Sequence, residues 1–402
     1  MTMLKTEVAV VGGGPAGLTA AIALARAGVK TALISSPPPQ EDHRTTALLL
    51  ASVMALEALG IWQSCSDKAA ALRCMRIVDD TGRLLRAQEI TFNCGEIGLD
   101  AFGYNMQNRD LLTALDNTAR SLGGSLKCFD SAATSIDIGA NDVTIALASG
   151  DHVSARLVVG ADGRRSLCRA AAGIESERRD YPQTALVFNL AHTRPHHNIS
   201  TEFHTPQGPF TLVPLPGQRS SLVFVTDPEI AQAVAALDEP ALMEELERRA
   251  HSILGKFKAE PGRGAFSLAM ETARRFGASR IALIGEAAHV LPPIGAQGLN
   301  LGLRDAAAIA EISVDALRAG EDPGSDTTLH RYEALRRADV TSRSFAADAL
   351  NWTLLADFLP LQGARQLGFF LMQTIGPLRR TVMREGVAPS LPRLRLMRGE
   401  TL

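Results

Sequence analysis

The sequence lacks an excess of charge of either sign. Its 41 lysines and arginines nearly balance 43 aspartates and glutamates, which leaves a net charge of −2 over 402 residues. Proteins that bind nucleic acid present a basic surface to the phosphates, so this balance gives no indication of a nucleic-acid partner. Hydrophobic residues make up 46% of the chain and charged residues 21%, proportions typical of a folded globular protein. The length suffices for two domains, or for one large domain with an insertion.

Long apolar runs and paired cysteines are also missing. No stretch approaches the roughly 20 apolar residues that a membrane-spanning helix needs, and the N-terminus leads directly into a strand rather than a signal sequence. The five cysteines form no CxxC pair and no metal-ligand spacing, so we expect free thiols, a reducing compartment and no metal site. These absences predict a cytoplasmic protein, with peripheral attachment to the inner face of a membrane as the alternative.

A glycine-rich turn stands near the N-terminus. A β-branched run at Glu7–Val11 leads into GGGPAG at 12–17, which is followed by a helix-forming stretch over 18–27 and a second apolar strand over 29–34. Strand, GxGxxG, helix and strand in this order are typical of dinucleotide binding, because the glycines permit the tight turn, the approach of a pyrophosphate and close packing of the helix on the strand. The predicted contacts are Gly12, Gly14, Pro15, Ala16 and Gly17.

One part of this fingerprint departs from expectation. A carboxylate usually follows the second strand and binds the ribose hydroxyls, but Ser35 and Ser36 stand there, and Glu41 and Asp42 come late. A hydrogen bond to a charged group is worth roughly 1.5–3 kcal/mol and a neutral one about half of that. Ser35 is therefore predicted to make a weaker contact with the adenosine half of the cofactor.

A second loop of this kind follows the apolar strand Arg280–Ile284. The segment 285–307 contains two adjacent prolines and three further glycines, and then becomes a helix rich in alanine and leucine. Glycines let a backbone approach a ligand closely, and the first N–H groups of a helix favour anionic groups. Open α/β sheets bind ligands at the carboxyl ends of their parallel strands, so this loop is a candidate binding site.

Three motifs together resemble a known family, the para-hydroxybenzoate hydroxylase-like (class A) FAD-dependent aromatic monooxygenases. The glycines of 12–17 match its first FAD fingerprint, 160–163 (GADG) matches its DG motif, and 285–289 (GEAAH) matches its GD motif. The resemblance implies that FAD is the cofactor and that NAD(P)H is a co-substrate. It also implies hydroxylation of an aromatic ring by O2 through a flavin C4a-hydroperoxide. The cofactor-binding residues that it implies are Arg44, Arg109, Asp162, Gly163, Gly285, Glu286, Pro293, Gly295, Ala296, Gln297, Gly298, Leu299 and Asn300.

Two residues depart from the GD motif. Glu286 replaces an aspartate, and Ala296 replaces the second glycine of GGQG, which adds a methyl group beside the flavin. His289 is expected to be a structural hydrogen-bonding residue rather than a base. No Ser-His-Asp set is present, and no side chain is assigned as a catalytic acid or base.

The block over 293–305, with its AGQGxNxGxxD pattern, resembles the ubiquinone-biosynthesis hydroxylases more closely. That resemblance implies a polyprenylated phenol as substrate. Two alternatives remain: a member of the wider family that acts on another aromatic compound, and a non-catalytic flavoprotein that supports a quinone-biosynthesis complex.

The expected architecture is α/β: a discontinuous Rossmann-like FAD-binding domain over 1–75, 100–180 and 270–325, with an inserted β-sheet substrate domain over 76–99 and 181–269 and C-terminal helices over 326–402. Within the insertion we expect strands at 74–79, 83–92, 184–192, 210–215 and 220–226, and a broken helix from Pro228 to about Leu254. The apolar stretch 345–371 is expected to pack on the FAD domain; the alternative is contact with a membrane or a partner enzyme.

Overall fold

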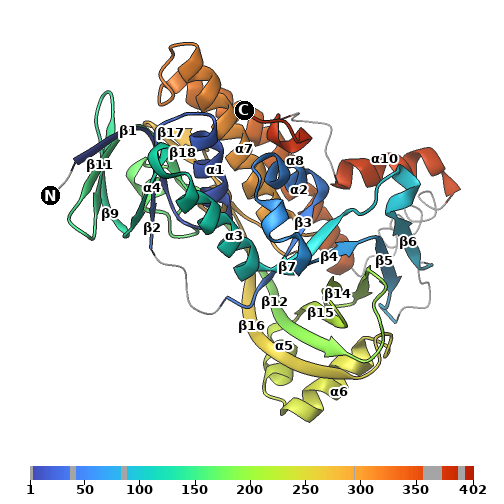
Figure 1. Cartoon of the computed structure of the whole chain (residues 1–402). Helices are drawn as coiled ribbons and strands as arrows, with labels where there is room; N and C mark the ends of the chain where they lie inside the picture. The colour runs from blue at the N-terminus through green and yellow to red at the C-terminus, as the bar shows by residue number, and fades with distance from the viewer. Residues whose placement is uncertain (1–2, 37–41, 83–87, 294, 356–373, 388–393) are drawn as a thin grey trace.

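The computed structural model describes residues 3–36, 42–82, 88–293, 295–355, 374–387 and 394–402. Two large sheets dominate it (Figure 1). The first has eight strands, with the order β17-β18-β11-β1-β2-β8 and the hairpin β9–β10 attached to β11. From β18 to β8 its neighbours run parallel. The strands are β1 Met3–Val11, β2 Thr31–Ser35, β8 Leu126–Asp130, β9 Ala133–Ile138, β10 Val143–Leu147, β11 His152–Gly160, β17 Gly277–Ala278 and β18 Ile281–Leu283.

Helices cover this sheet. Helix α1 (Pro15–Arg26) contacts both α7 (Gln297–Arg318) and α3 (Asn108–Ser121), and the short α4 (Leu167–Ala171) contacts β11. Proline at the first turn suits the start of α1, and all its residues from Gly17 to Ala25 are buried. The expected helix after the glycine turn and the parallel βα arrangement are therefore confirmed.

The second sheet also has eight strands, in the order β19-β16-β12-β15-β14-β13-β5-β6. Helices α5 (Pro228–Ala235) and α6 (Glu239–Arg249) cover one of its faces with a core that includes Phe203, Phe210 and Phe224. Its long strands β12 and β16 curve along the lower side of the molecule (Figure 1). The strands are β5 Cys74–Asp79, β6 Ile90–Asn93, β12 Ser176–His192, β13 Ile199–Thr205, β14 Gly208–Leu215, β15 Arg219–Thr226, β16 Phe257–Ala273 and β19 His289–Val290.

A small third sheet, ordered β3-β7-β4, lies between the two large ones. It consists of β3 (Thr45–Leu49), β4 (Ala69–Leu72) and β7 (Gly103–Gln107), and α2 (Leu50–Ala58) follows β3 directly. The chain also contains short 3-10 helices. They are η1 Trp62–Ser64, η2 Ser66–Lys68, η3 Cys94–Ile97, η4 Gly123–Ser125, η5 Gly285–Ala287 and η6 Leu396–Arg398.

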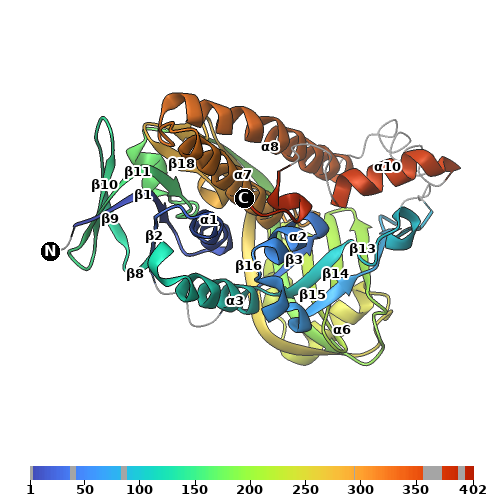
Figure 2. The ribbon, with the colours of Figure 1, turned by 45° about the horizontal axis from the view of Figure 1, so that its top comes forward.

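The C-terminal part is helical, as expected. Helix α8 (Asp326–Leu355) packs along α7, and α10 (Gly376–Val387) continues in its direction (Figure 2). Among the described residues, no helix is both long enough and apolar enough to cross a bilayer. The apolar stretch 345–371 lies outside the residues whose side chains are described.

Several elements of the second sheet and its helices have bounds that differ from the predicted ones. The expected strand 184–192 is the second half of the 17-residue β12, and the helix expected to run to Leu254 ends at Arg249. Of the expected strand 83–92, residues 83–87 lie outside the described part, and the strand that follows begins at Ile90. Strands β13 and β16 were not predicted. Pro261 and two glycines interrupt β16, and its pairing with β12 shifts register twice, as β-bulges allow.

Candidate functional site

The three sequence motifs leave the same edge of the first sheet. Parallel pairing aligns Val11 at the end of β1 with Ile34 on β2 and with Gly160 at the end of β11. Gly160 is aligned in turn with Leu283 at the end of β18. The loops after β1, β11 and β18 therefore emerge side by side, where parallel sheets bind ligands.

The first two motifs are in direct backbone contact. A Cβ on Gly12, whose φ is +121°, would lie 2.2 Å from the carbonyl oxygen of Ala161, and a Cβ on Gly17 would lie 2.0 Å from the carbonyl oxygen of Gly12. Neither position has room for a methyl group, so these two glycines are required by packing. A Cβ on Gly13 would lie 2.6 Å from Cβ of Ser35. Ser35 thus lies where the sequence predicted it, beside the turn.

Gly14 differs from its neighbours because a Cβ there would meet nothing within 4 Å. It is the N-cap of α1, where no side chain caps the helix and no acidic residue occupies the first turn. The first N–H groups of α1 therefore face open space, in the orientation that attracts an anion. This opening fits the pyrophosphate of a dinucleotide.

Helix α7 begins close to α1. A Cβ on Gly302 would lie 3.2 Å from Cα of Gly285 and 3.4 Å from Cβ of Ala16, so the third motif packs against the first. The start of α7 is also without a side-chain cap or an acidic first turn, and a Cβ on Gly298 would again meet nothing within 4 Å. Two helix N-termini without side-chain caps thus lie close to one another.

Ala296, the N-cap of α7, has a left-handed conformation with φ 54° and ψ 30°. A side chain at such φ values is strained, by roughly 1–2 kcal/mol for a non-glycine residue. Alanine in place of the second glycine of GGQG therefore strains the backbone at this position and also adds a methyl group to the loop.

Ala296→Gly is expected to raise the free energy of unfolding by about 0.5–1 kcal/mol, since the relief of strain exceeds the entropic cost of glycine. Urea denaturation of both proteins would measure the change. Ala319→Gly is the matched control, because Ala319 ends the same helix in a right-handed conformation and should gain nothing. Equal effects of the two substitutions would contradict strain at Ala296.

A buried carboxylate holds the start of the third motif. Asp305, on α7, accepts hydrogen bonds from the backbone N–H of Gly285 (3.0 Å), from Nε2 of His289 (2.6 Å) and from Nε of Arg336 on α8 (2.7 Å). Burial alone would raise the pKa of Asp305, but the charges of His289 and Arg336 outweigh it and hold the pKa well below its usual range. His289 is buried and structural, as expected.

The same cluster reaches the other end of the loop. Arg336 also pairs with Asp339 (2.5 Å), which in turn binds Arg304 (3.0 Å) and Arg343 (3.2 Å). Arg343 Nη1 donates to Oε1 of Gln297 at the start of α7 (3.3 Å). The cluster therefore forms hydrogen bonds to Gly285 at one end of the loop and to Gln297 at the other. Sequence reasoning missed them, since the arginines and aspartates of α8 resemble those of any solvated helix.

Arg44, which directly precedes β3, is held by its neighbours. Its side chain forms a two-pronged pair with Asp42 (2.9 and 2.8 Å), and Nδ2 of Asn108 donates to the same carboxylate at 2.5 Å. Although burial opposes ionisation, these bonds lower the pKa of Asp42 to about 2. The hydrogen bonds to Asp42 raise the pKa of Arg44, with a smaller contribution from the charge of Glu286. Glu286 also forms an exposed pair with Arg164 at 3.2 Å. Asp42 therefore positions Arg44.

Other candidate residues have structural partners. Both oxygens of Asp162 are bonded to the start of α4, to Ser166 Oγ (2.6 Å) and the N–H of Cys168 (3.0 Å). Asn300 is buried and joins α7 to Leu49 and Ala47 through its amide. Arg109 is exposed at the start of α3, and Gly163 adopts a positive φ. Pro293, Gly295 and Gly298 are exposed, whereas Ala296, Gln297 and Leu299 are half-buried.

The second sheet approaches the site with the face opposite α5 and α6. Nδ2 of Asn105 on β7 donates to the carbonyl of Pro214 (2.9 Å), and Nδ2 of Asn189 donates to the carbonyl of His43 (2.8 Å). Strand alternation puts Val187, Val223 and Phe266 on this face. Phe266 is 47% exposed, an unusual value for an aromatic side chain on a sheet. This face therefore carries apolar side chains, with the ring of Phe266 open to solvent, beside the polar Asn189.

Comparison with known proteins gives consistent matches. A family model described as an FAD binding domain matches residues 5–343. The ubiquinone hydroxylase UbiL of Rhodospirillum rubrum is 36% identical over 98% of this chain and 93% of its own. The 3-demethoxyubiquinol 3-hydroxylase of Escherichia coli is 29% identical over 96% of this chain and 99% of its own. The p-nitrophenol 4-monooxygenase PnpA of Pseudomonas putida superposes with a TM-score of 0.80 at 20% identity, covering 98% and 100% of the two chains.

Proposed function

The chain belongs to the FAD-binding-domain family of flavin-dependent aromatic hydroxylases, and from this we propose that its substrate is a polyprenylated phenol in ubiquinone biosynthesis. The observation that supports this substrate is the 36% identity, across almost the whole chain, to a ubiquinone hydroxylase. NAD(P)H is the reductant that the family uses, and FAD is the cofactor.

We propose that FAD lies along the edge where the three loops meet. The N–H groups at the start of α1, beyond Gly14, would hold the pyrophosphate, and Ser35 would bind the ribose. The backbone from Gly295 to Leu299 would lie against the flavin ring, where the start of α7 stabilises negative charge on it. When bound, FAD supplies the transfer of one oxygen atom from O2 to the ring, with electrons from NAD(P)H.

The residues of the chain would position the ring and keep water away from it. Phe266 and Val223, on the face of the second sheet opposite α5 and α6, would pack against the phenol and position it. The division of the chain into an FAD-binding domain and an inserted substrate domain, at the boundaries given above, remains a prediction.

Contact with a membrane also remains a proposal. A polyprenyl chain partitions into lipid, so the enzyme must reach it there. On α10 and just before it, Ile375, Leu378 and Val382 are 43%, 40% and 45% exposed at helical spacing, and Arg380 and Arg384 accompany them. Apolar and basic side chains on one helix suit an anionic membrane surface.

The direct test uses the purified protein. It should be yellow, oxidise NAD(P)H faster when a short-chain prenylated phenol is added, and insert one labelled oxygen atom from ¹⁸O2 into the ring. Cells lacking the protein should accumulate a quinone precursor that is one oxygen atom lighter, as seen by mass spectrometry. Hydroxylation with an unchanged quinone pool would indicate another aromatic substrate, and colourless protein that FAD cannot reconstitute would indicate the non-catalytic scaffold.

A further inference from the structure

A cavity of about 440 Å³ opens on the far side of the second sheet. Its lining residues Thr201 and Leu212 are on β13 and β14, and Leu212 and Leu254 belong to the core between the sheet and α5–α6. The cavity therefore lies on the face of the sheet that carries α5 and α6, opposite the face that approaches the glycine loops. The proposed hydroxylation does not use it.

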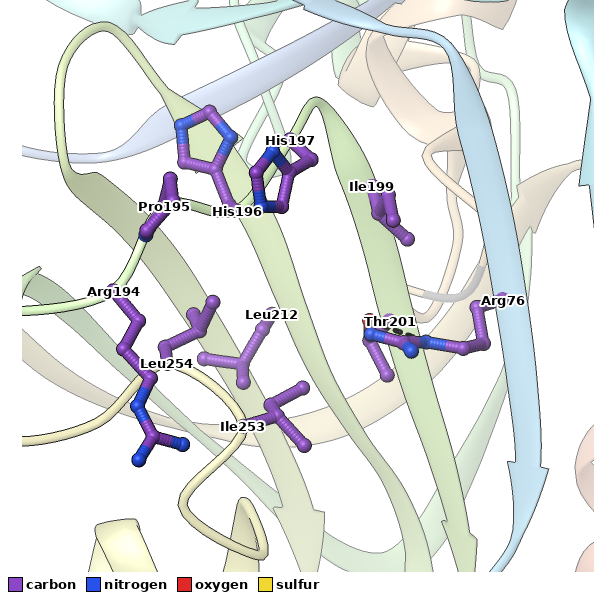
Figure 3. Close-up of a pocket in the computed structure, with 10 residues that line it drawn as sticks. All are labelled: Arg76, Arg194, Pro195, His196, His197, Ile199, Thr201, Leu212, Ile253 and Leu254. Carbon is purple, nitrogen blue, oxygen red and sulfur yellow. Dashed lines mark hydrogen bonds between the residues drawn. The ribbon is translucent and has the colours of Figure 1, made fainter.

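Basic side chains surround this cavity (Figure 3). Arg76, Arg194, His196 and His197 are among its ten lining residues, and none of the ten is acidic. Arg76 is held by Thr201 Oγ1, which accepts from Nε at 3.2 Å and Nη2 at 3.1 Å, and Nη1 of Arg194 donates to the carbonyl of Ser252 at 3.2 Å. An arginine has five donor hydrogens, so both keep donors for a ligand.

The two histidines have different roles. Both ring nitrogens of His196 are used within the protein: Nδ1 accepts from the N–H of Asn198 (3.0 Å) and Nε2 bonds to the carbonyl of Leu215 (3.0 Å). His197 is exposed, and it and Asn198 have left-handed φ values of 52° and 59°. Consecutive non-glycine residues in this region are strained, and such strain is found where a side chain must be held in place.

The floor of the cavity is apolar. Ile199, Leu212, Ile253 and Leu254 form it, between the two arginines (Figure 3). A small inorganic anion would leave this floor in contact with water, and a neutral hydrocarbon would leave the remaining donors of the two arginines without an acceptor. The ligand that suits both features carries an anionic group on a hydrocarbon chain.

We propose that this cavity binds an amphipathic anion, with its phosphate or carboxylate on Arg76, Arg194 and His197 and the first part of its chain on the apolar floor. The ligand comes either from the headgroup region of an anionic membrane or from a free single-chain amphiphile. The site acts independently of the hydroxylation, so its failure leaves the proposed function untouched.

The test is calorimetric titration of the FAD-loaded protein with dodecyl phosphate. Inorganic phosphate and dodecanol should each bind at least tenfold more weakly than dodecyl phosphate. Arg76→Gln and Arg194→Gln should each weaken dodecyl phosphate at least tenfold, while Arg178→Gln, an exposed arginine paired with Asp180 on β12, serves as the control. Equal affinity in R76Q, R194Q and R178Q, or equal affinity for phosphate and dodecyl phosphate, would overturn the proposal.

His197→Gly distinguishes a loss of binding from a loss of folding. It removes the imidazole donor and replaces a left-handed residue by glycine, so the variant should unfold at a higher temperature and still bind dodecyl phosphate several-fold more weakly. Unchanged affinity in this stable variant counts against the site. If the protein sediments with phosphatidylglycerol vesicles and the double variant R76Q/R194Q does not, the ligand is a membrane lipid. If the protein binds dodecyl phosphate but does not sediment with vesicles, the ligand is a free amphiphile.

Discussion

Asp305→Asn is expected to lower the free energy of unfolding by about 3–5 kcal/mol, the range for removing one partner of a buried ion pair. Asp305 is 1% exposed and Arg336 is fully buried, so neither water nor another side chain can replace the lost charge easily. An asparagine amide would also direct a donor at His289, Arg336 or the N–H of Gly285, all of which donate to the carboxylate. Urea denaturation at neutral pH would measure the loss.

The control for Asp305→Asn is Asp116→Asn. Asp116 pairs with Arg120 on the surface of α3, where both side chains are about 40% exposed, and such a pair is worth less than about 1 kcal/mol. The Asp305 substitution should also release FAD, because it loosens the start of the third loop. Equal urea midpoints for D305N and wild type would show that the cluster contributes no net stability.

The effect of Asp305→Asn should depend on pH. The pKa of Asp305 is lowered in the folded protein, so its charge stabilises the fold above the unfolded pKa of about 3.9, and that contribution is lost as pH falls through the lower folded value. The difference in stability between wild type and D305N should therefore be constant from neutral pH to about pH 5 and shrink in stronger acid. A difference that grows in acid would contradict an ionised Asp305.

The sequence predicted the strand, turn and helix of the first motif well because local chemistry specifies them. Gly12 and Gly17 have no room for a side chain, so any chain that makes this turn must carry glycine at both positions. The order of strand, turn and helix after β1 follows from short-range periodicity, and the parallel pairing of β1 with β2 follows from their connection through α1.

The rest depends on contacts between distant parts of the chain. Strand β16 carries Pro261 and Gly262, which argue against a strand, yet the amide of Asn189 binds the carbonyl of Pro261, and Gly262 adopts a φ of +121° against His43. Arg336 and Asp305 are 31 residues apart and bind only because α8 packs on α7. Neither feature has a local signal, so both needed the structure.

Gly17→Ala and Gly14→Ala should separate the fold from the cofactor site. A Cβ on Gly17 would lie 2.0 Å from a backbone oxygen, which requires the turn to shift, and overpacking of this kind costs about 3 kcal/mol or more. A Cβ on Gly14 would meet no protein atom within 4 Å, and its φ of −74° suits alanine. G17A should therefore lose both stability and FAD. The apoprotein of G14A should be as stable as the wild-type apoprotein.

The Gly14→Ala protein carries the test of the site. If the pyrophosphate of FAD occupies the opening at the start of α1, the added methyl group should weaken FAD at least tenfold while the urea midpoint of the apoprotein stays unchanged. Fluorescence titration of apoprotein with FAD measures the affinity, and Gly124→Ala, another position where a Cβ meets nothing within 4 Å, is the control. Wild-type affinity in G14A would place the pyrophosphate elsewhere, because a methyl group at the N-cap of α1 cannot avoid a ligand bound to the first turn.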